Sequence, residues 1–372
     1  MCGIAGYLLK APSEGASIKI PILLDSIRQR GPDDEGVCLI SRKNNKARFY
    51  QTERTLPTLE SPLEPLGHGP SKICHDLALI HTRYSIIDLT SGGHQPFVSS
   101  DGSIVLIFNG EIYNFLELRR DLSNLGVSFR TSSDTEVLIE GYRMWGHQIW
   151  SKLNGFWAVA LYDFSTRSFS LSRDRLGVAP LYYRETREGL YFASSIRGLV
   201  EIEPETIEID QDKVIGFIQT SLKDFDDSTF YQQIKSVSPA SVMTFEHGTG
   251  KVQDSKIFQY WTLPSARLST NDLSLEDAVG FYRETFFNAV EIRLRADVKV
   301  AFELSGGLDS SSIVAAAAIL RNSEITTFTI HVSEENEEPY ARSMLEKYPG
   351  IDYRVLSDTE DSFLSESRGF LK

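Results

Sequence analysis

The chain opens with MCGIAGYLLK (residues 1–10), in which a thiol at the second position precedes an apolar run from Ile4 to Leu9. The apolar run predicts a strand directly after the cysteine. Removal of Met1 would leave Cys2 with a nucleophilic sulfur and an α-amine, whose reference pKa is about 7.7 to 8.0. One residue could then supply both the nucleophile and the base of a catalytic site. By position alone, a small buried structural cysteine is the more common case.

The composition limits the class of protein. At 372 residues the chain is long enough for two domains with separate cores. Its 38 basic and 51 acidic residues give a formal net charge of −13 with no basic cluster, which argues against a nucleic-acid or anionic-membrane partner. The 3 cysteines lack CxxC spacing, so neither a disulfide framework nor a zinc site is indicated. With neither a signal peptide nor a run of about 18 apolar residues, we expect a cytoplasmic protein.

The pattern of apolar residues changes twice along the chain. Residues 1–205 mix short β-runs with amphipathic helices, which predicts an α+β domain with largely antiparallel sheets. Residues 206–264 are less patterned and are interpreted as trailing strands and a connection. From 265 to 372, strand-like and helical segments alternate, which predicts part of a parallel α/β nucleotide-binding domain. The proline-containing excursion from Lys43 to Cys74 is assigned no structure.

Several short motifs follow one another in the first domain. They are Cys2-Gly3-Ile4, Arg30-Gly31-Pro32-Asp33, His81-Thr82-Arg83, Asn109-Gly110-Glu111-Ile112-Tyr113-Asn114 and Ser133-Asp134-Thr135-Glu136. In this order they resemble the class II glutamine amidotransferases, which are N-terminal-nucleophile hydrolases with an αββα sandwich. The resemblance covers roughly the first 200 residues. It implies glutamine as a substrate, Cys2 as the nucleophile, and Arg30 and His81 as structural supports of the site.

The other site residues are implied by the same resemblance. Asn109 and the backbone N–H of Gly110 match the oxyanion hole, whose donors hold the tetrahedral oxyanion of acyl transfer. Glutamine is a zwitterion, so its α-carboxylate needs a cation and its α-ammonium a carboxylate. Arg83 and Asp134 match these two positions, with Glu111 as a weaker contributor. Without the family context, Asn-Gly is also typical of a hairpin turn, Arg83 of a surface salt bridge and Asp134 of a helix N-cap.

The second domain carries the loop Ser305-Gly306-Gly307-Leu308-Asp309-Ser310 between an apolar strand and a helix. Successive backbone N–H groups in such a loop can cradle an anion, although the GxxxxGK[ST] pattern is absent. The loop resembles the ATP-pyrophosphatase domain of glutamine-hydrolysing asparagine synthetases. The resemblance implies an ATP site made of Leu304, Ser305, Gly306, Gly307, Asp309, Ser310 and Ile330. Asp309 would also help to hold Mg²⁺.

The combined resemblance implies an ATP-dependent amidotransferase with glutamine, aspartate and ATP as partners. Glutamine hydrolysis at Cys2 would supply ammonia for the amidation of aspartate to asparagine, with release of AMP and pyrophosphate. Members of this family often form homodimers, so a homodimer is among the implied partners.

The chain also departs from the family pattern. The family's later Ser-Gly-Glu-Gly-x-Asp-Glu segment has no counterpart after Asp309, so we expect a truncated synthetase half. Ala193-Ser194-Ser195 stands where family members usually carry Ala-Ser-Glu, which puts an interdomain role of that glutamate in doubt. Three alternatives stay open: a glutaminase-only product, a non-catalytic truncated paralogue, and an amidotransferase for another carboxylate acceptor.

Overall fold

The structure is a computed structural model that describes residues 1–13, 15–57, 63–66, 74–246, 250–265, 268–269, 272–331 and 338–357. The chain divides into two compact units, Met1–Pro264 and Ser265–Lys372, and each has a hydrophobic core of its own. Within the described residues, no helix combines the length and the apolar character needed to cross a membrane.

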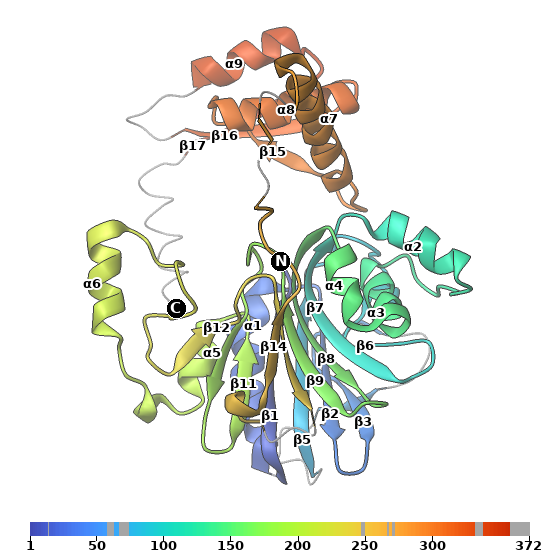
Figure 1. The fold of residues 1–372 in the computed structure, drawn as a ribbon, viewed down its shortest axis with the longest axis vertical. Coiled ribbons are helices and arrows are strands. Elements are labelled where there is room, and N and C mark those ends of the chain that lie inside the picture. Colours follow the sequence, from blue (N-terminus) through green and yellow to red (C-terminus); the bar gives the residue numbers. More distant parts are fainter. Residues whose placement is uncertain are drawn as a thin grey trace. The chain divides into compact units, whose positions relative to one another are not determined.

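The larger sheet of the first unit places the strand after Cys2 at its centre (Figure 1). Its eight strands have the order β12-β10-β11-β1-β5-β2-β3-β4, and every pair is antiparallel except β3 with β4. The bounds are β1 Gly3–Ser13, β2 Asp34–Ser41, β3 Lys46–Gln51, β4 Glu64–Pro65, β5 His75–Arg83, β10 Tyr182–Glu185, β11 Gly189–Ala193 and β12 Ile234–Ser236. Because β1 pairs on both edges, the backbone that follows Cys2 is held from both sides.

The smaller sheet has six antiparallel strands in the order β14-β13-β9-β8-β7-β6. The bounds are β6 Phe97–Val98, β7 Ile104–Ile112, β8 Gly155–Asp163, β9 Ser168–Arg173, β13 Ser241–Glu246 and β14 Lys256–Gln259. Residues 206–264 therefore contribute β12 to one sheet and β13 and β14 to the other. They are an integral part of the first unit and not only a connection after it.

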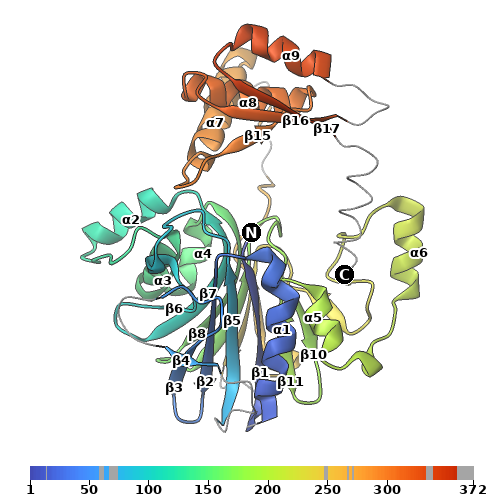
Figure 2. The same ribbon diagram turned by 180° about the vertical axis from the view of Figure 1, so that it is seen from behind.

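The first unit is a four-layer sandwich, αββα. One apolar core fills the space between the two sheets. A second core joins the larger sheet to α1 and α5, and a third joins the smaller sheet to α2, α3 and α4 (Figure 2). The bounds are α1 Ile20–Ile27, α2 Phe115–Asn124, α3 Asp134–Trp145, α4 Ile149–Lys152, α5 Ile196–Glu201 and α6 Gln211–Thr220. The shorter 3₁₀ helices are η1 Gly15–Lys19, η2 Arg28–Arg30, η3 Ser91–Gly93, η4 Gly146–Gln148, η5 Pro204–Thr206 and η6 Val252–Asp254.

The layers explain the sequence pattern. Both faces of β5 are covered, so its central residues Leu77–Ile80 form a continuous apolar run that contributes to the cores on both sides of the sheet. Ile20, Leu23, Leu24 and Ile27 recur at helical spacing, and in α1 all four side chains are buried against the larger sheet. Of the excursion from Lys43 to Cys74, the structure gives β3 and β4, while residues 58–62 and 67–73 lie outside the described residues.

The second unit contains a parallel sheet in the order β15-β16-β17. The bounds are β15 Ala301–Glu303, β16 Thr326–His331, β17 Asp352–Ser357, α7 Leu275–Arg293, α8 Leu308–Leu320 and α9 Glu338–Lys347. Ser274 caps α7 by accepting a hydrogen bond from the N–H of Asp277 at 3.1 Å, as its capping-box sequence indicates. The three helices and the sheet share one apolar core around Leu304 and Val314.

Candidate active site

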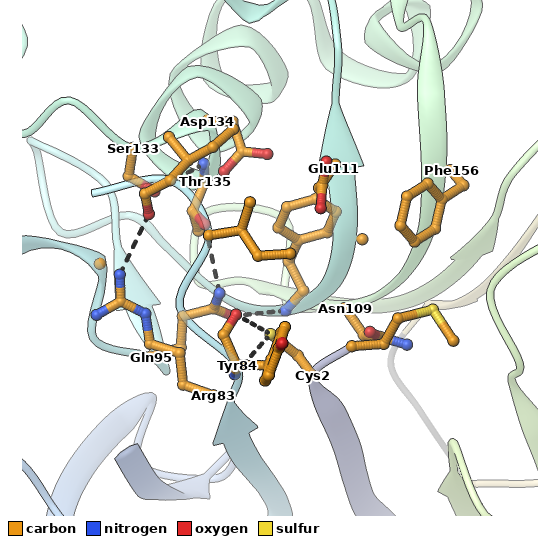
Figure 3. A pocket seen from close by; sticks show the side chains of 16 residues that line it. Cys2, Arg83, Tyr84, Gln95, Asn109, Glu111, Ser133, Asp134, Thr135 and Phe156 are labelled. Carbon is orange, nitrogen blue, oxygen red and sulfur yellow. Dashed lines mark hydrogen bonds between the residues drawn. The ribbon is translucent and has the colours of Figure 1, made fainter. Parts of the chain in front are cut away.

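One pocket of the first unit collects residues from several elements (Figure 3). Its walls come from the two residues before β1, the end of β5 with the loop after it, the second half of β7, the start of β8 and the first turn of α3. The lining includes all six residues predicted for glutamine hydrolysis: Cys2, Arg83, Asn109, Gly110, Glu111 and Asp134. It also includes Met1, Tyr84, Ile86, Ile87, Gly93, Gln95, Phe108, Ser133, Thr135 and Phe156.

Cys2 is held at the pocket by contacts of its side chain with the backbone of Tyr84. Its Sγ lies 3.6 Å from the carbonyl oxygen of Tyr84 and 3.4 Å from the backbone nitrogen of the same residue. The Nε of Arg30 donates to the carbonyl oxygen of Cys2 at 3.0 Å, so this arginine orients the nucleophile's backbone. Burial raises the pKa of the Cys2 thiol, and the hydrogen bond from Tyr84 only partly opposes this. The sulfur is therefore a thiol at neutral pH and needs a base to become a nucleophile.

The second half of β7 has one open edge, and this edge faces the pocket. On that side β6 pairs only with Val105 and Leu106. Further along, the N–H of Phe108 donates to Oε1 of Gln95 at 2.6 Å, and the N–H of Ile112 donates to Oδ2 of Asp134 at 3.0 Å. Because N–H groups alternate sides along a strand, the N–H of Gly110 points to the same edge, between the two that are capped.

Gly110 is required by the close approach of β8. A Cβ at this position would lie 2.0 Å from the carbonyl oxygen of Phe156, which is far inside van der Waals contact. The strand continues through Asn109 and Gly110 to Ile112, so the two expected oxyanion donors lie inside β7 and the interpretation of Asn-Gly as a hairpin turn is wrong.

Asn109 is fully buried, and neither its Nδ2 nor its Oδ1 has a hydrogen-bond partner among the described residues. An unpaired buried amide costs about 1 to 3 kcal/mol, so such groups are rare in folded proteins unless they serve a ligand. Asn109 thus combines two properties that an oxyanion donor needs: it lines the pocket and its donor is not used by the fold.

Asp134 is a buried carboxylate at the start of α3. The N-cap of this helix is Ser133, whose hydroxyl accepts from the N–H of Thr135 at 3.1 Å, so the N-cap interpretation of Asp134 is wrong. Burial raises the pKa of Asp134 to about 7; the N–H of Ile112 lowers it and the Glu111 carboxylate raises it. Burial also raises the pKa of Glu111. Two carboxyl groups in a confined pocket favour a cationic ligand.

Arg83 is buried, with 4% of its surface exposed, which excludes the surface salt bridge. Its Nη1 donates to the carbonyl oxygen of Thr90 at 2.7 Å, and its Nη2 donates to those of Ile87, at 3.3 Å, and Asp88. A Cβ at Gly93 would overlap the guanidinium, at 1.8 Å from Nη2. The loop after β5 is therefore wrapped around Arg83, and this arginine shapes one wall of the pocket.

His81 lies behind the site and does not line it. It is fully buried, and its Nε2 is 3.2 Å from the carbonyl oxygen of Phe108. Burial lowers the pKa of His81 to about 3, so the ring is neutral at physiological pH. The neutral ring can donate to the carbonyl oxygen of Phe108, in the strand that carries Asn109. His81 therefore supports this strand and is not placed to transfer a proton to or from the substrate.

Comparison with known proteins identifies the family. Residues 66–261 match the family described as glutamine amidotransferase domain. The chain belongs to the glutamine amidotransferase family. Residues 282–364 match the family described as asparagine synthase. The resemblance predicted from the motifs is confirmed by these two matches.

Individual relatives of this amidotransferase are longer than the chain. A putative asparagine synthetase (glutamine-hydrolyzing) 2 from Methanocaldococcus jannaschii is 27% identical over 371 residues, covering 94% of this chain and 63% of the relative. Asparagine synthetase (glutamine-hydrolyzing) 1 from Bacillus subtilis is 33% identical over 338 residues, covering 90% of this chain and 46% of the relative. The solved glutamine phosphoribosylpyrophosphate amidotransferase from B. subtilis is 19% identical with a TM-score of 0.48, covering 88% of this chain and 65% of that one.

Sequence reasoning missed Gln95 as a residue of the amidotransferase pocket. Its Nε2 donates to Oγ1 of Thr135 at 3.3 Å while its Oε1 accepts from Phe108, so it joins β7 to the first turn of α3. Thr135 lies 40 residues and Phe108 13 residues from Gln95 along the chain. The only local signal is an amide next to proline in His94-Gln95-Pro96, which by itself indicates a turn.

In the second unit, the predicted nucleotide residues lie around one loop. Gly306, with φ +83°, lets the chain turn between β15 and α8, and Ser305 Oγ lies 3.0 Å from Ser310 Oγ. Leu304 is buried below the loop, and Asp309 is in the first turn of α8. Ile330 belongs to β16, but its side chain lies outside the described residues. No group of three His, Cys, Asp or Glu side chains able to hold a metal occurs in the described part of the chain.

Proposed function

We propose that the first unit hydrolyses glutamine to glutamate and ammonia with Cys2 as nucleophile. The observation that carries this proposal is the open edge of β7, where the N–H of Gly110 and the amide of Asn109, which has no partner among the described residues, face the pocket that contains the Cys2 thiol. Two donors beside a nucleophile are the arrangement that acyl transfer needs, because the charge that develops on the carbonyl oxygen must be stabilised.

The chemical steps follow from these groups. The α-amine of Cys2, free once Met1 is removed, takes the thiol proton, and the sulfur attacks the side-chain amide carbon of glutamine. The oxyanion is held by Asn109 Nδ2 and the Gly110 N–H. Collapse of the tetrahedral adduct breaks the C–N bond, and the proton held by the α-amine passes to the leaving ammonia. Water, deprotonated by the same amine, then cleaves the thioester to give glutamate and the original thiol.

Substrate binding uses the charges around this centre. Asp134 and Glu111 would face the α-ammonium of glutamine. Arg83 has N–H groups beyond the three bonds that it makes to the loop after β5, and these would receive the α-carboxylate. The zwitterion is thus clamped at both charges, and its side chain is directed toward Cys2.

The second unit is proposed to use the ammonia for ATP-dependent amidation of aspartate to asparagine. The turn at Gly306, the Ser305 and Ser310 hydroxyls and the first turn of α8 form a loop that suits a pyrophosphate group. Mg²⁺ is usually bound in proteins by one or two carboxylates together with substrate phosphates, and Asp309 would supply one of them. ATP supplies the activation that turns the aspartate carboxylate into an acceptor for ammonia.

The direct test is to incubate the purified chain with glutamine and to measure glutamate and ammonia. Release of both in equal amounts supports the glutaminase, and no release with intact protein rejects it. Addition of aspartate and Mg-ATP, with glutamine or with ammonium, then tests the second unit through asparagine, AMP and pyrophosphate. Glutamate without asparagine would support a glutaminase-only protein.

Glutamine binding should strengthen with rising pH until about pH 7. The α-ammonium favours ionised Asp134, so binding lowers its pKa from about 7 and releases a proton. The dissociation constant should therefore fall by about tenfold per pH unit between pH 5.5 and 6.5 and level off above 7. Calorimetry on the Cys2→Ala protein measures binding without turnover. Asp134→Asn should bind weakly with a flat profile, and an unchanged slope in that variant would reject the assignment.

Arg83→Lys should weaken glutamine binding and destabilise the loop together. A lysine keeps the charge but has no planar fork for the carbonyl groups of Ile87, Asp88 and Thr90. We expect a ten- to hundredfold weaker affinity, since charge-assisted hydrogen bonds contribute about 1.5 to 3 kcal/mol each, and a lower melting temperature. Asp134→Asn is the matched control, because it should weaken binding without lowering the melting temperature. Normal affinity in Arg83→Lys would show that the α-carboxylate binds elsewhere.

A further inference from the structure

We propose that Gln95 is a positioning residue of the oxyanion hole: it takes the place of a missing strand beside β7 and fixes the backbone that carries Asn109 and Gly110. The expected effect of Gln95 on kcat rests on the proposed glutaminase reaction. Its expected effect on the backbone of β7 rests on the hydrogen-bond geometry alone.

The open edge of β7 makes such a residue necessary. The N–H groups of Phe108, Gly110 and Ile112 share this edge, and β6 ends before reaching them. If all three were free, water or a shifted strand could compete for them. Gln95 caps the first, Asp134 caps the third, and the central N–H of Gly110 is left for the substrate. The two caps bracket the donor and set its direction.

Gln95 also ties the two halves of the pocket together. One end of its amide accepts from the strand residue before Asn109, and the other end donates to Thr135, the helix residue after Asp134. Gln95 is 4% exposed, and a Cβ at Gly36 would lie 2.1 Å from its carbonyl oxygen, so its backbone has little room to move. A shift of this amide would change the distance between the oxyanion donors and the carboxylate that binds the α-ammonium.

The kinetic test compares variants that keep or remove the bond to Phe108. Gln95→Met has a similar length but no acceptor, and Gln95→Glu keeps an oxygen for the N–H of Phe108. We expect Gln95→Met to lower kcat about tenfold with KM within about threefold, because small misplacement of donors acts on the transition state. Gln95→Glu should recover most of kcat. Thr135→Val, which removes only the helix partner, should lower kcat less than Gln95→Met, because the bond from Phe108 to Gln95 remains.

A second readout does not depend on turnover. Hydrogen exchange at the Phe108 amide should be faster in Gln95→Met than in the wild-type protein and in Gln95→Glu, because its acceptor is gone. If Gln95→Met does not fold, Gln95→Asn gives the same test, since its amide is one methylene too short to reach Phe108.

The outcomes separate this inference from the proposed reaction. A wild-type protein that releases no glutamate contradicts the glutaminase, and the inference is then decided by the exchange of the Phe108 amide alone. Unchanged exchange in Gln95→Met overturns the positioning role. An active enzyme in which Gln95→Met has wild-type kcat, or raises only KM, also overturns it.

Discussion

Replacing Cys2 with alanine is expected to reduce glutamine hydrolysis by at least about 10⁴-fold, because removal of a catalytic nucleophile leaves only binding and the oxyanion donors. The fold should be unchanged, since the hydrogen bonds that Sγ makes in the described part of the chain go to the backbone of Tyr84 and the strand after Cys2 is paired on both sides. The measurement is glutamate release, with circular dichroism and thermal unfolding to confirm the folded state. Substantial remaining activity in a folded Cys2→Ala protein would contradict the assignment.

The chain offers a matched control for this substitution. Cys74 is an exposed free cysteine outside the pocket, and Cys74→Ala should hydrolyse glutamine at the wild-type rate. The same assay can be combined with mass spectrometry of the N-terminus. A preparation that keeps Met1 should be inactive, because the Cys2 nitrogen is then an amide and cannot accept the thiol proton.

Local sequence patterns predict an element correctly where the spacing of its own apolar residues defines the face that is buried. The spacing of Ile20, Leu23, Leu24 and Ile27 gives α1 correctly, because one apolar stripe packs on one sheet. Residues 206–264 show the opposite case. Their strands β12, β13 and β14 have 3, 6 and 4 residues, which is too short for a clear two-residue alternation. β12 and β13 are defined by pairing with β10 and β9 elsewhere in the chain, and β14 pairs with β13.

The same distinction applies to the site. Residues that act through their own side-chain chemistry, such as Cys2 and Asn109, could be predicted from motifs. The wrapping of the loop around Arg83 could not, because its acceptors are backbone carbonyl groups that every residue carries. Gln95 was missed since its role depends on where β6 stops relative to β7, which is a property of the sheet and not of the neighbouring sequence.

The amide of Asn109 links catalysis to stability. A buried donor without a partner among the described residues destabilises the folded state, and an oxyanion or a substrate carbonyl that accepts from Nδ2 would relieve this cost. Asn114 gives a useful contrast nearby. Its Nδ2 donates to the carbonyl oxygen of Lys152 at 3.0 Å and its Oδ1 accepts from the N–H of Asn154 at 2.8 Å, so its amide is used by the fold.

Asn109→Ala should therefore lower kcat by about 10²- to 10³-fold, the usual effect of losing one oxyanion donor, while KM changes little. Because the amide has no partner to lose among the described residues, the melting temperature should not fall as it does for a hydrogen-bonded asparagine. Asn114→Ala should show the reverse, with kcat within about twofold of wild type and a lower melting temperature, since two backbone groups lose their partners. Steady-state kinetics and thermal unfolding of both variants test this. If Asn109→Ala raised only KM, the amide would contact the ground state of the substrate and the oxyanion assignment would be wrong.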